Sequence, residues 1–107
     1  MAASPDATAC LVNFAWLLSA HRDAAVRRPA EAVRLAERAV TLTARSAEAL
    51  DALAAAYASD GRFDSAVKTG MEALARLDST QASALAGDIR ARVALYRRQI
   101  AFIVENH

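Results

Sequence analysis

Hydrophobic residues recur every three or four positions along most of this chain, which is the spacing of an amphipathic α-helix. The clearest examples, one set near the N-terminus and one in the middle, are Leu11, Phe14, Ala15, Leu18, Leu50, Leu53, Ala54 and Tyr57. We expect the large residues of this set, together with Phe63, to fill the space between packed helices, and the small Ala15 and Ala54 to let the helices approach closely. The pattern predicts helices over residues 8–20, 29–43, 47–59, 63–77 and 82–104, and therefore an all-α fold.

The predicted helix boundaries coincide with residues that start and end helices. Pro29 suits a first helical turn, where its missing N–H costs nothing. Ser46 is placed to cap the helix that begins at Ala47. Gly61 can adopt a positive φ and so end that helix, before Phe63 opens the next one.

The chain also contains an internal repeat. Residues 32–40 match residues 66–74 with an offset of 34, whereas residues 11–18 match residues 50–57 with an offset of 39. The difference of five residues indicates an insertion, which we place in the polar stretch 21–28. Each repeat therefore consists of two predicted helices.

These paired helices resemble the tetratricopeptide repeat (TPR) family, whose unit is a helix–turn–helix of 34 residues. Residues 47–80 carry the resemblance best, and residues 8–46 match less fully. In the better window Leu50 replaces the family's usual Trp, and Leu53 matches the family's leucine. The family's small and aromatic positions are met by Ala54, Tyr57, Gly61, Phe63, Ala66 and Ala73. The sequence departs from the family pattern at two places. Gly70 stands where the family has a large residue, and the family's closing proline is absent at 78–79. Both departures predict weaker packing of this unit against a following one.

The resemblance implies a right-handed α-solenoid fragment, similar to the C-terminal repeats of larger bacterial TPR proteins. We expect one domain over 1–107, with repeat 1 at 8–46, repeat 2 at 47–80 and a capping helix at 82–104. The alternative is an unrelated alanine-rich helical bundle.

The function implied by the resemblance is a protein–protein interaction scaffold. TPR ligands commonly lie in a concave groove lined by the first helix of each unit, and the candidates carried over to this chain are Val12, Trp16, Ser19, Glu48, Asp51, Ala55 and Ser59. The positions of the family's clamp for a peptide carboxylate are apolar or acidic here, so an apolar or basic segment fits better. Trp16 is the candidate hot spot. Alternatively it packs against residues 21–28 or against a preceding repeat.

The last predicted helix carries an apolar stripe that we expect to cover the second repeat, consisting of Leu85, Ile89, Val93, Tyr96, Ile100 and Ile103. Leu95, Phe102 and Val104 fall partly off this stripe, so the final turns are apolar on more than one side. This feature favours an alternative function, a structural end cap or homodimerisation module of a longer repeat protein.

The charge and composition of the sequence restrict the classes of partner that we expect for this chain. Thirteen basic residues against 12 acidic ones leave a net charge of +1, which disfavours a nucleic-acid partner. We expect the local cluster at Arg90, Arg92, Arg97 and Arg98 to form a solvated helix face. Cys10 is the single cysteine, which excludes an intramolecular disulfide and favours a cytoplasmic location. The apolar run 10–18 is too short to cross a bilayer, so no membrane insertion is expected.

The residues that could support chemistry are sparse. His21 and His107 are far apart and lack a nearby Cys or carboxylate array with metal-ligand spacing. The sequence has no Gly-rich phosphate loop and no nucleophile-elbow motif. We therefore expect no catalysis, no metal and no cofactor. A small-molecule or enzymatic domain would need a polar pocket, for which the sequence offers no candidate.

Overall fold

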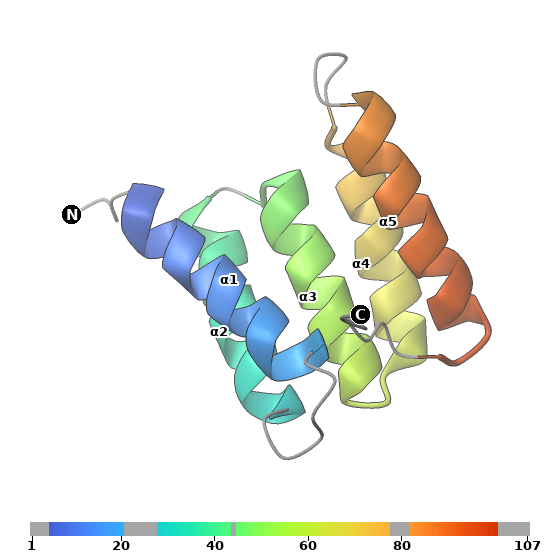
Figure 1. The fold of residues 1–107 in the computed structure, drawn as a ribbon, viewed down its shortest axis with the longest axis horizontal. Helices are drawn as coiled ribbons and strands as arrows, with labels where there is room; N and C mark the ends of the chain where they lie inside the picture. Colours follow the sequence, from blue (N-terminus) through green and yellow to red (C-terminus); the bar gives the residue numbers. More distant parts are fainter. Residues whose placement is uncertain (1–4, 21–27, 44, 78–81, 101–107) are drawn as a thin grey trace, which may run out of the picture.

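Five α-helices make up the part of the chain that the computed structural model describes, residues 5–20, 28–43, 45–77 and 82–100. They are α1 (Pro5–Ala20), α2 (Pro29–Leu42), α3 (Ala47–Ser59), α4 (Phe63–Ala75) and α5 (Ala82–Arg97), as Figure 1 shows. The all-α prediction is confirmed, and the predicted bounds agree to within three residues except at the end of α5.

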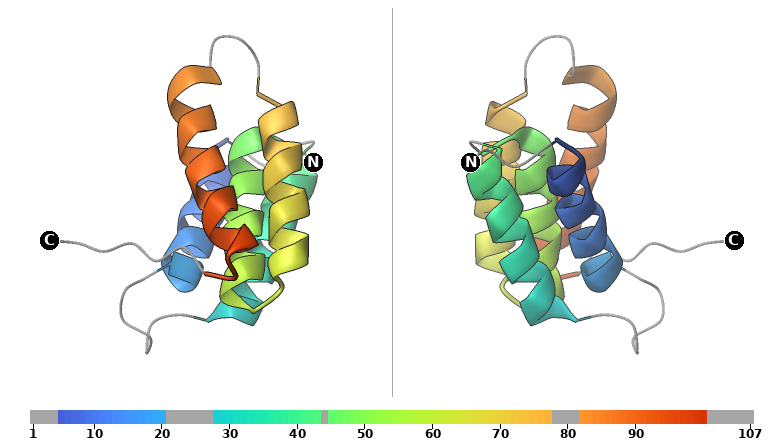
Figure 2. Two further views of the ribbon diagram at one scale, coloured as in Figure 1. Left: turned by 90° about the vertical axis from the view of Figure 1, so that its right-hand side faces the viewer. Right: turned by 90° about the vertical axis from the view of Figure 1, so that its left-hand side faces the viewer.

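Packing follows the order of the chain, with two additional contacts. Each helix packs against the next, and α3 also contacts α1 and α5. In the side views of Figure 2, α1 and α5 lie on one side of α3, and α2 and α4 lie on the other. Among the described residues no Cα atom of α1 lies within 8 Å of one in α5. These two helices therefore flank α3, and their backbones do not approach each other closely.

The core is built largely from alanine. Ala15, Ala32, Ala54 and Ala66 are fully buried, and such small side chains let neighbouring helices approach closely. Larger side chains, including the buried Leu50, Ile89 and Tyr96, fill the space that remains.

Phe14 is an exception to the predicted core. Its side chain is 51% exposed, so the expectation that it fills the space between helices is wrong. Ala15 and Leu18 define the buried line of α1. Phe14 precedes Ala15 by one residue, and this step turns its side chain by about 100° around the helix. It therefore points away from α2 and α3, as does Leu17, which is 46% exposed.

Gly70 lies where α4 and α5 approach most closely. A Cβ atom added to Gly70 would lie 2.5 Å from Cγ2 of Val93 on α5, a separation at which atoms overlap. The prediction that Gly70 weakens packing against the following element is therefore wrong. Val93 occupies the space that a side chain at position 70 would need.

The helix ends depend on specific caps. Oγ of Ser46 accepts a hydrogen bond from the backbone N–H of Ala49 at 3.2 Å, which confirms the predicted N-cap of α3. Gly61 has φ 81°, which confirms the predicted end of α3. At the end of α5, Gln99 adopts φ 58° and the N–H of Ile100 donates to the carbonyl of Leu95 at 2.9 Å.

This arrangement ends α5 at Arg97, so the prediction of a helix reaching residue 104 is wrong. The apolar pattern continues beyond that point, but the backbone at Gln99 turns out of the helix. Ile100 is 41% exposed. Phe102, Ile103 and Val104 lie outside the described residues.

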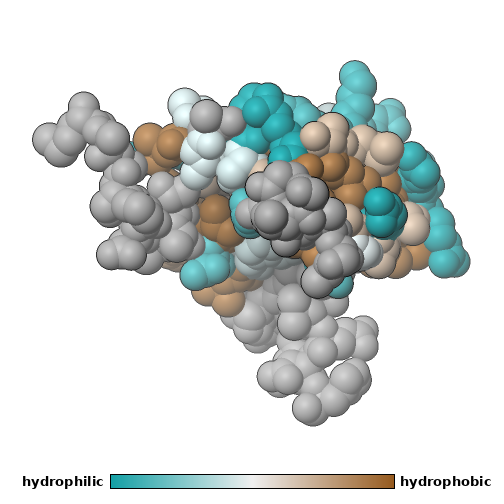
Figure 3. Space-filling view, turned by 90° about the horizontal axis from the view of Figure 1, so that it is seen from above, coloured by the Kyte–Doolittle hydropathy of each residue, from teal (hydrophilic) through white to brown (hydrophobic). Residues whose placement is uncertain are grey.

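The surface mixes hydrophilic and hydrophobic side chains. Seen from above, apolar patches on both halves of the molecule alternate with hydrophilic residues (Figure 3). Within the described residues, none of the helices combines the length and the hydropathy that a membrane crossing requires.

Candidate functional site

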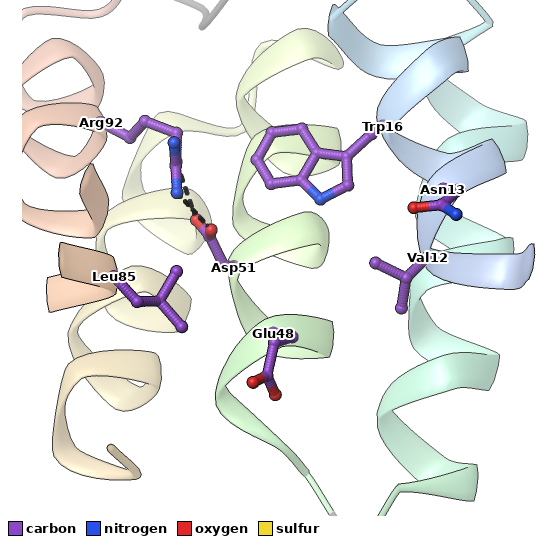
Figure 4. A pocket seen from close by; sticks show the side chains of 7 residues that line it. All are labelled: Val12, Asn13, Trp16, Glu48, Asp51, Leu85 and Arg92. Atoms are coloured by element: carbon purple, nitrogen blue, oxygen red, sulfur yellow. Dashed lines mark hydrogen bonds and ion pairs between the residues drawn. The ribbon is translucent and has the colours of Figure 1, made fainter. Parts of the chain in front are cut away.

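The most distinctive surface feature is a groove between α1 and α5, with α3 at its base. It contains a pocket of about 410 Å³. The side chains that line the pocket come from all three helices and are Val12, Asn13, Trp16, Glu48, Asp51, Leu85 and Arg92 (Figure 4).

Helical spacing explains why these residues meet. Val12 and Trp16 are four residues apart on α1, and Glu48 and Asp51 are three apart on α3. Leu85 is seven residues before Arg92 on α5, about two helical turns. Because such separations place side chains on one face of a helix, each helix presents one short row of residues to the groove.

Asp51 and Arg92 form an ion pair at the base of the groove. Nε of Arg92 donates to Oδ1 of Asp51 at 3.0 Å, and Nη2 donates to Oδ2 at 2.5 Å. The two side chains are only 14% and 5% exposed, respectively. Burial raises the pKa of the Asp51 carboxyl, and the two hydrogen bonds from Arg92 oppose this shift. Both carboxylate oxygens are thus satisfied by one guanidinium.

Trp16 is held by the same arginine. The guanidinium carbon of Arg92 lies 5.1 Å from the centroid of the Trp16 ring, a distance typical of a cation–π contact. In Figure 4 the indole extends from α1 toward Arg92, over α3. Arg92 therefore links α5 to α3 through Asp51 and to α1 through Trp16.

Four of the seven predicted groove residues, Val12, Trp16, Glu48 and Asp51, line this pocket. The other three, Ser19, Ala55 and Ser59, do not. Ser19 is fully buried and its hydroxyl donates to the carbonyl of Trp16 at 3.4 Å. Ala55 is 1% exposed, and Ser59 is partly buried.

Among the residues predicted for self-association, Leu95 is partly buried and packs against the core. Phe102 and Val104 lie outside the described residues. Within the described part of the chain, the exposed large hydrophobic residues lie elsewhere and are Phe14, Leu17, Leu42, Met71 and Ile100.

Three pocket residues were missed by the sequence analysis: Asn13, Leu85 and Arg92. The expectation that Arg92 belongs to a solvated helix face is wrong, because its side chain is largely buried against Asp51. One feature of the sequence could have indicated the role of Arg92. Asp51 stands in the alanine-rich helix 47–59, which contains no basic residue, so a buried carboxylate there needs a cation from another helix.

A second pocket, of about 550 Å³, lies between α4 and the end of α5. Its lining includes the charged residues Asp64, Lys68 and Arg97, together with Tyr96. The residues that follow Ile100 lie outside the described ranges, so we base no function on this pocket.

Comparisons with protein-family models, with curated proteins and with solved structures gave no match to this chain. Within the described residues, no group of three or more His, Cys, Asp or Glu side chains is placed to hold a metal ion. The groove itself is therefore the basis for assigning a function.

Proposed function

We propose that this chain is a TPR-type scaffold module that binds a segment of another protein in the groove between α1 and α5. It carries out no catalysis in this proposal. The observation that carries it is the partly buried Trp16, held by Arg92 beside an apolar pocket to which three helices contribute.

The repeat and the packing support the TPR-type assignment together. The matched sequence segments coincide with the helix pairs α1–α2 and α3–α4, which pack in chain order. The first helices of the two pairs, α1 and α3, lie beside each other and line the groove. In this interpretation α5 takes the place of the first helix of a third unit.

The chemistry of the groove supports binding rather than reaction. Its buried carboxylate, Asp51, is engaged by Arg92 through both oxygens, so its hydrogen bonds are made within the protein rather than to a ligand. The walls at Val12, Trp16 and Leu85 are apolar. A partly buried tryptophan next to aliphatic side chains is typical of the residues that dominate binding energy at protein interfaces.

The test is a selection of short random peptides displayed against the immobilised full chain. Trp16 is the single tryptophan of the sequence, so its fluorescence reports directly on occupation of the groove. We expect selected peptides to shift this fluorescence and to lose binding to a Val12→Asp variant. Phe14→Asp is the matched control, because Phe14 lies on the same helix but does not line the pocket. Selection of no peptide, or equal binding to both variants, would contradict the proposal.

A second candidate function is self-association of the module, as an end cap of a longer repeat protein. The observation that favours it is the exposure of Phe14 and Leu17, three residues apart on one face of α1. Size-exclusion chromatography with light scattering tests it. A dimer that is lost in Phe102→Asp assigns the contact to the C-terminal segment, and one lost in Phe14→Asp assigns it to α1. A monomer at all concentrations excludes this function.

A further inference from the structure

A third pocket, the Met71 pocket, lies between α4 and α5 and has a volume of about 280 Å³. The left view of Figure 2 looks toward these two helices, which lie side by side. The residues that line the pocket are Met71, Leu74, Arg90, Val93, Ala94 and Arg97. None of them lines the groove pocket between α1 and α5. The lining thus combines four apolar side chains with two arginines and, among the described residues, no carboxylate.

Helical spacing places the two arginines at the ends of one row. Arg90, Ala94 and Arg97 are four and three residues apart on α5, so their side chains share one face of the helix. Seven residues separate the two arginines by about 10 Å along the helix axis. On α4, Met71 and Leu74 are three residues apart and line the same pocket. The Met71 pocket is therefore an apolar hollow with a cation toward each end.

The charges of these two arginines are not compensated by the described part of the chain. Both residues are exposed, and neither forms an ion pair with a described carboxylate. Nη2 of Arg97 donates to the sulfur of Met71 at 3.7 Å, and a thioether is only a weak acceptor. Each guanidinium has five N–H donors. Most of these donors therefore face solvent and can be offered to a ligand.

The three carboxylates of α4 and α5 have other surroundings. Glu72 accepts hydrogen bonds from Nε and Nη2 of Arg45 at 2.5 and 2.6 Å. Asp88 lies four residues before Arg92 and therefore on the groove side of α5. Asp64 lies in the first turn of α4 and lines the second pocket, where a lysine offsets its charge. The two arginines therefore determine the charge of the Met71 pocket.

We infer that the Met71 pocket binds an acidic amphipathic helix of another protein. Carboxylates at positions i and i+7 of such a helix are about 10 Å apart, which matches the separation of Arg90 and Arg97. Apolar residues at i+3 and i+4 lie between them on the same face and enter the pocket beside Met71. An extended segment fits less well. Carboxylates about 10 Å apart on a strand are about three residues apart and point to opposite faces.

The charge pattern favours a protein segment over a membrane or a nucleic acid. Clusters that bind anionic lipids usually contain about four to eight lysines or arginines, whereas this pocket presents two. The chain has a net charge of only +1, and nucleic-acid binding usually depends on a strong basic excess. This inference does not depend on the function proposed for the groove, since the two pockets share no lining residue.

A differential selection tests the inference. A display library of helical peptides, randomised on one face, is selected on the immobilised full chain and counter-selected on the variant Arg90→Gln with Arg97→Gln. Peptides that bind elsewhere, including the groove, are removed by the counter-selection. We expect enrichment of aspartate or glutamate at i and i+7, with leucine, isoleucine, phenylalanine or methionine at i+3 or i+4. Circular dichroism should show the same fold for the variant and the wild type.

The affinity of one enriched, fluorescently labelled peptide is then measured by anisotropy. Arg90→Gln with Arg97→Gln should weaken binding about three- to tenfold at low salt and less at high salt, because exposed ion pairs are weak and screened. The matched control is Arg34→Gln with Arg38→Gln, which removes two exposed arginines of α2 outside this pocket. This control and the groove variant Val12→Asp should each change the affinity less than about twofold.

The outcomes are separate from those for the groove. Recovery of no peptide that distinguishes the wild type from the Arg90→Gln, Arg97→Gln variant would overturn this inference and leave the groove proposal standing. Equal weakening by the α2 control would overturn it as well. Retention of the chain on phosphatidylserine vesicles, lost in the same variant and without any peptide binding, would assign the surface to a membrane instead.

Discussion

Arg92 on α5 donates two hydrogen bonds to the carboxylate of Asp51 on α3, although the two residues are 41 positions apart in the sequence. The same guanidinium lies over the ring of Trp16 on α1. Since α3 and α5 have the least extensive contact of all the packed helix pairs, this ion pair is a principal link between them.

Replacing Arg92 by methionine should destabilise the domain by about 3 kcal/mol, because it leaves the buried carboxylate of Asp51 unpaired. Adding Asp51→Leu to the same protein should recover most of that loss, since two apolar side chains need no partner. Urea denaturation of the wild type, both single variants and the double variant gives the coupling energy. Additive losses in the double variant would show that the two side chains do not interact.

The cost of Arg92→Met should depend on pH. In the wild type, burial raises the pKa of Asp51 above its ordinary value of 3.8, while Arg92 opposes the rise. A raised pKa means that the folded state binds the proton more tightly, so stability from this group is greatest at low pH and declines as the pH rises. Without Arg92 the pKa rises further. The destabilisation should thus be largest at neutral pH and shrink toward pH 3.8.

Denaturation midpoints of wild type and Arg92→Met, measured across that pH range, check this expectation. Arg92→Met with Asp51→Asn is the control, because it has no carboxyl at position 51 to titrate. A difference between wild type and Arg92→Met that stays constant with pH would contradict it.

Gly70 and Gly87 should respond in opposite ways to alanine. At Gly70 the new Cβ meets Cγ2 of Val93, and Val93 cannot rotate away cheaply because valine has one preferred rotamer in a helix. We expect a loss of about 1–3 kcal/mol, as for other overpacked cores. At Gly87 no described atom lies within 4 Å of the added Cβ, so the alanine should stabilise α5 by about 0.5–1 kcal/mol.

Thermal unfolding of both alanine variants measures these effects. Adding Val93→Ala to Gly70→Ala should relieve the overlap and restore part of the stability. A Gly70→Ala protein as stable as Gly87→Ala would show that α4 and α5 do not approach as closely as the structure indicates.

Tyr96→Phe should leave stability unchanged or raise it by up to about 1 kcal/mol, since a buried hydroxyl without a partner carries an uncompensated desolvation cost. Tyr96 is 1% exposed, and its hydroxyl has no hydrogen-bond partner among the described residues. Chemical denaturation of the variant checks this, with Tyr57→Phe as the comparison. Tyr57 is less buried and its hydroxyl donates to Glu37 at 3.4 Å. A clear loss in Tyr96→Phe would show that its hydroxyl has a partner.

Local features of the sequence determined the helices and most of their ends. The apolar spacing placed α1 to α5, and Pro29, Ser46 and Gly61 marked boundaries that the structure bears out. These features act within a few residues of the chain, through backbone hydrogen bonds and allowed φ values, so they can be inferred without tertiary contacts. The repeat of 34 residues likewise indicated which helices form pairs.

The groove was only half predicted. Val12, Trp16, Glu48 and Asp51 followed from the family resemblance and line the pocket, because they lie on the first helix of each pair. Ser19 and Ala55, at the same kind of position, are buried. Their exposure depends on how closely neighbouring helices approach, which the position on one helix does not specify.

Only the tertiary structure decided the role of α5. Arg92 looked like one of several surface arginines until the fold brought it to Asp51, and Gly70 looked like a weak point until Val93 occupied its space. The sequence by itself determined the helices, their pairing and one side of the groove. The α5 side of the groove, and the ion pair at its base, depend on contacts between residues that are far apart in the sequence. These contacts form only once the helices have packed, because their energies depend on burial and on distance.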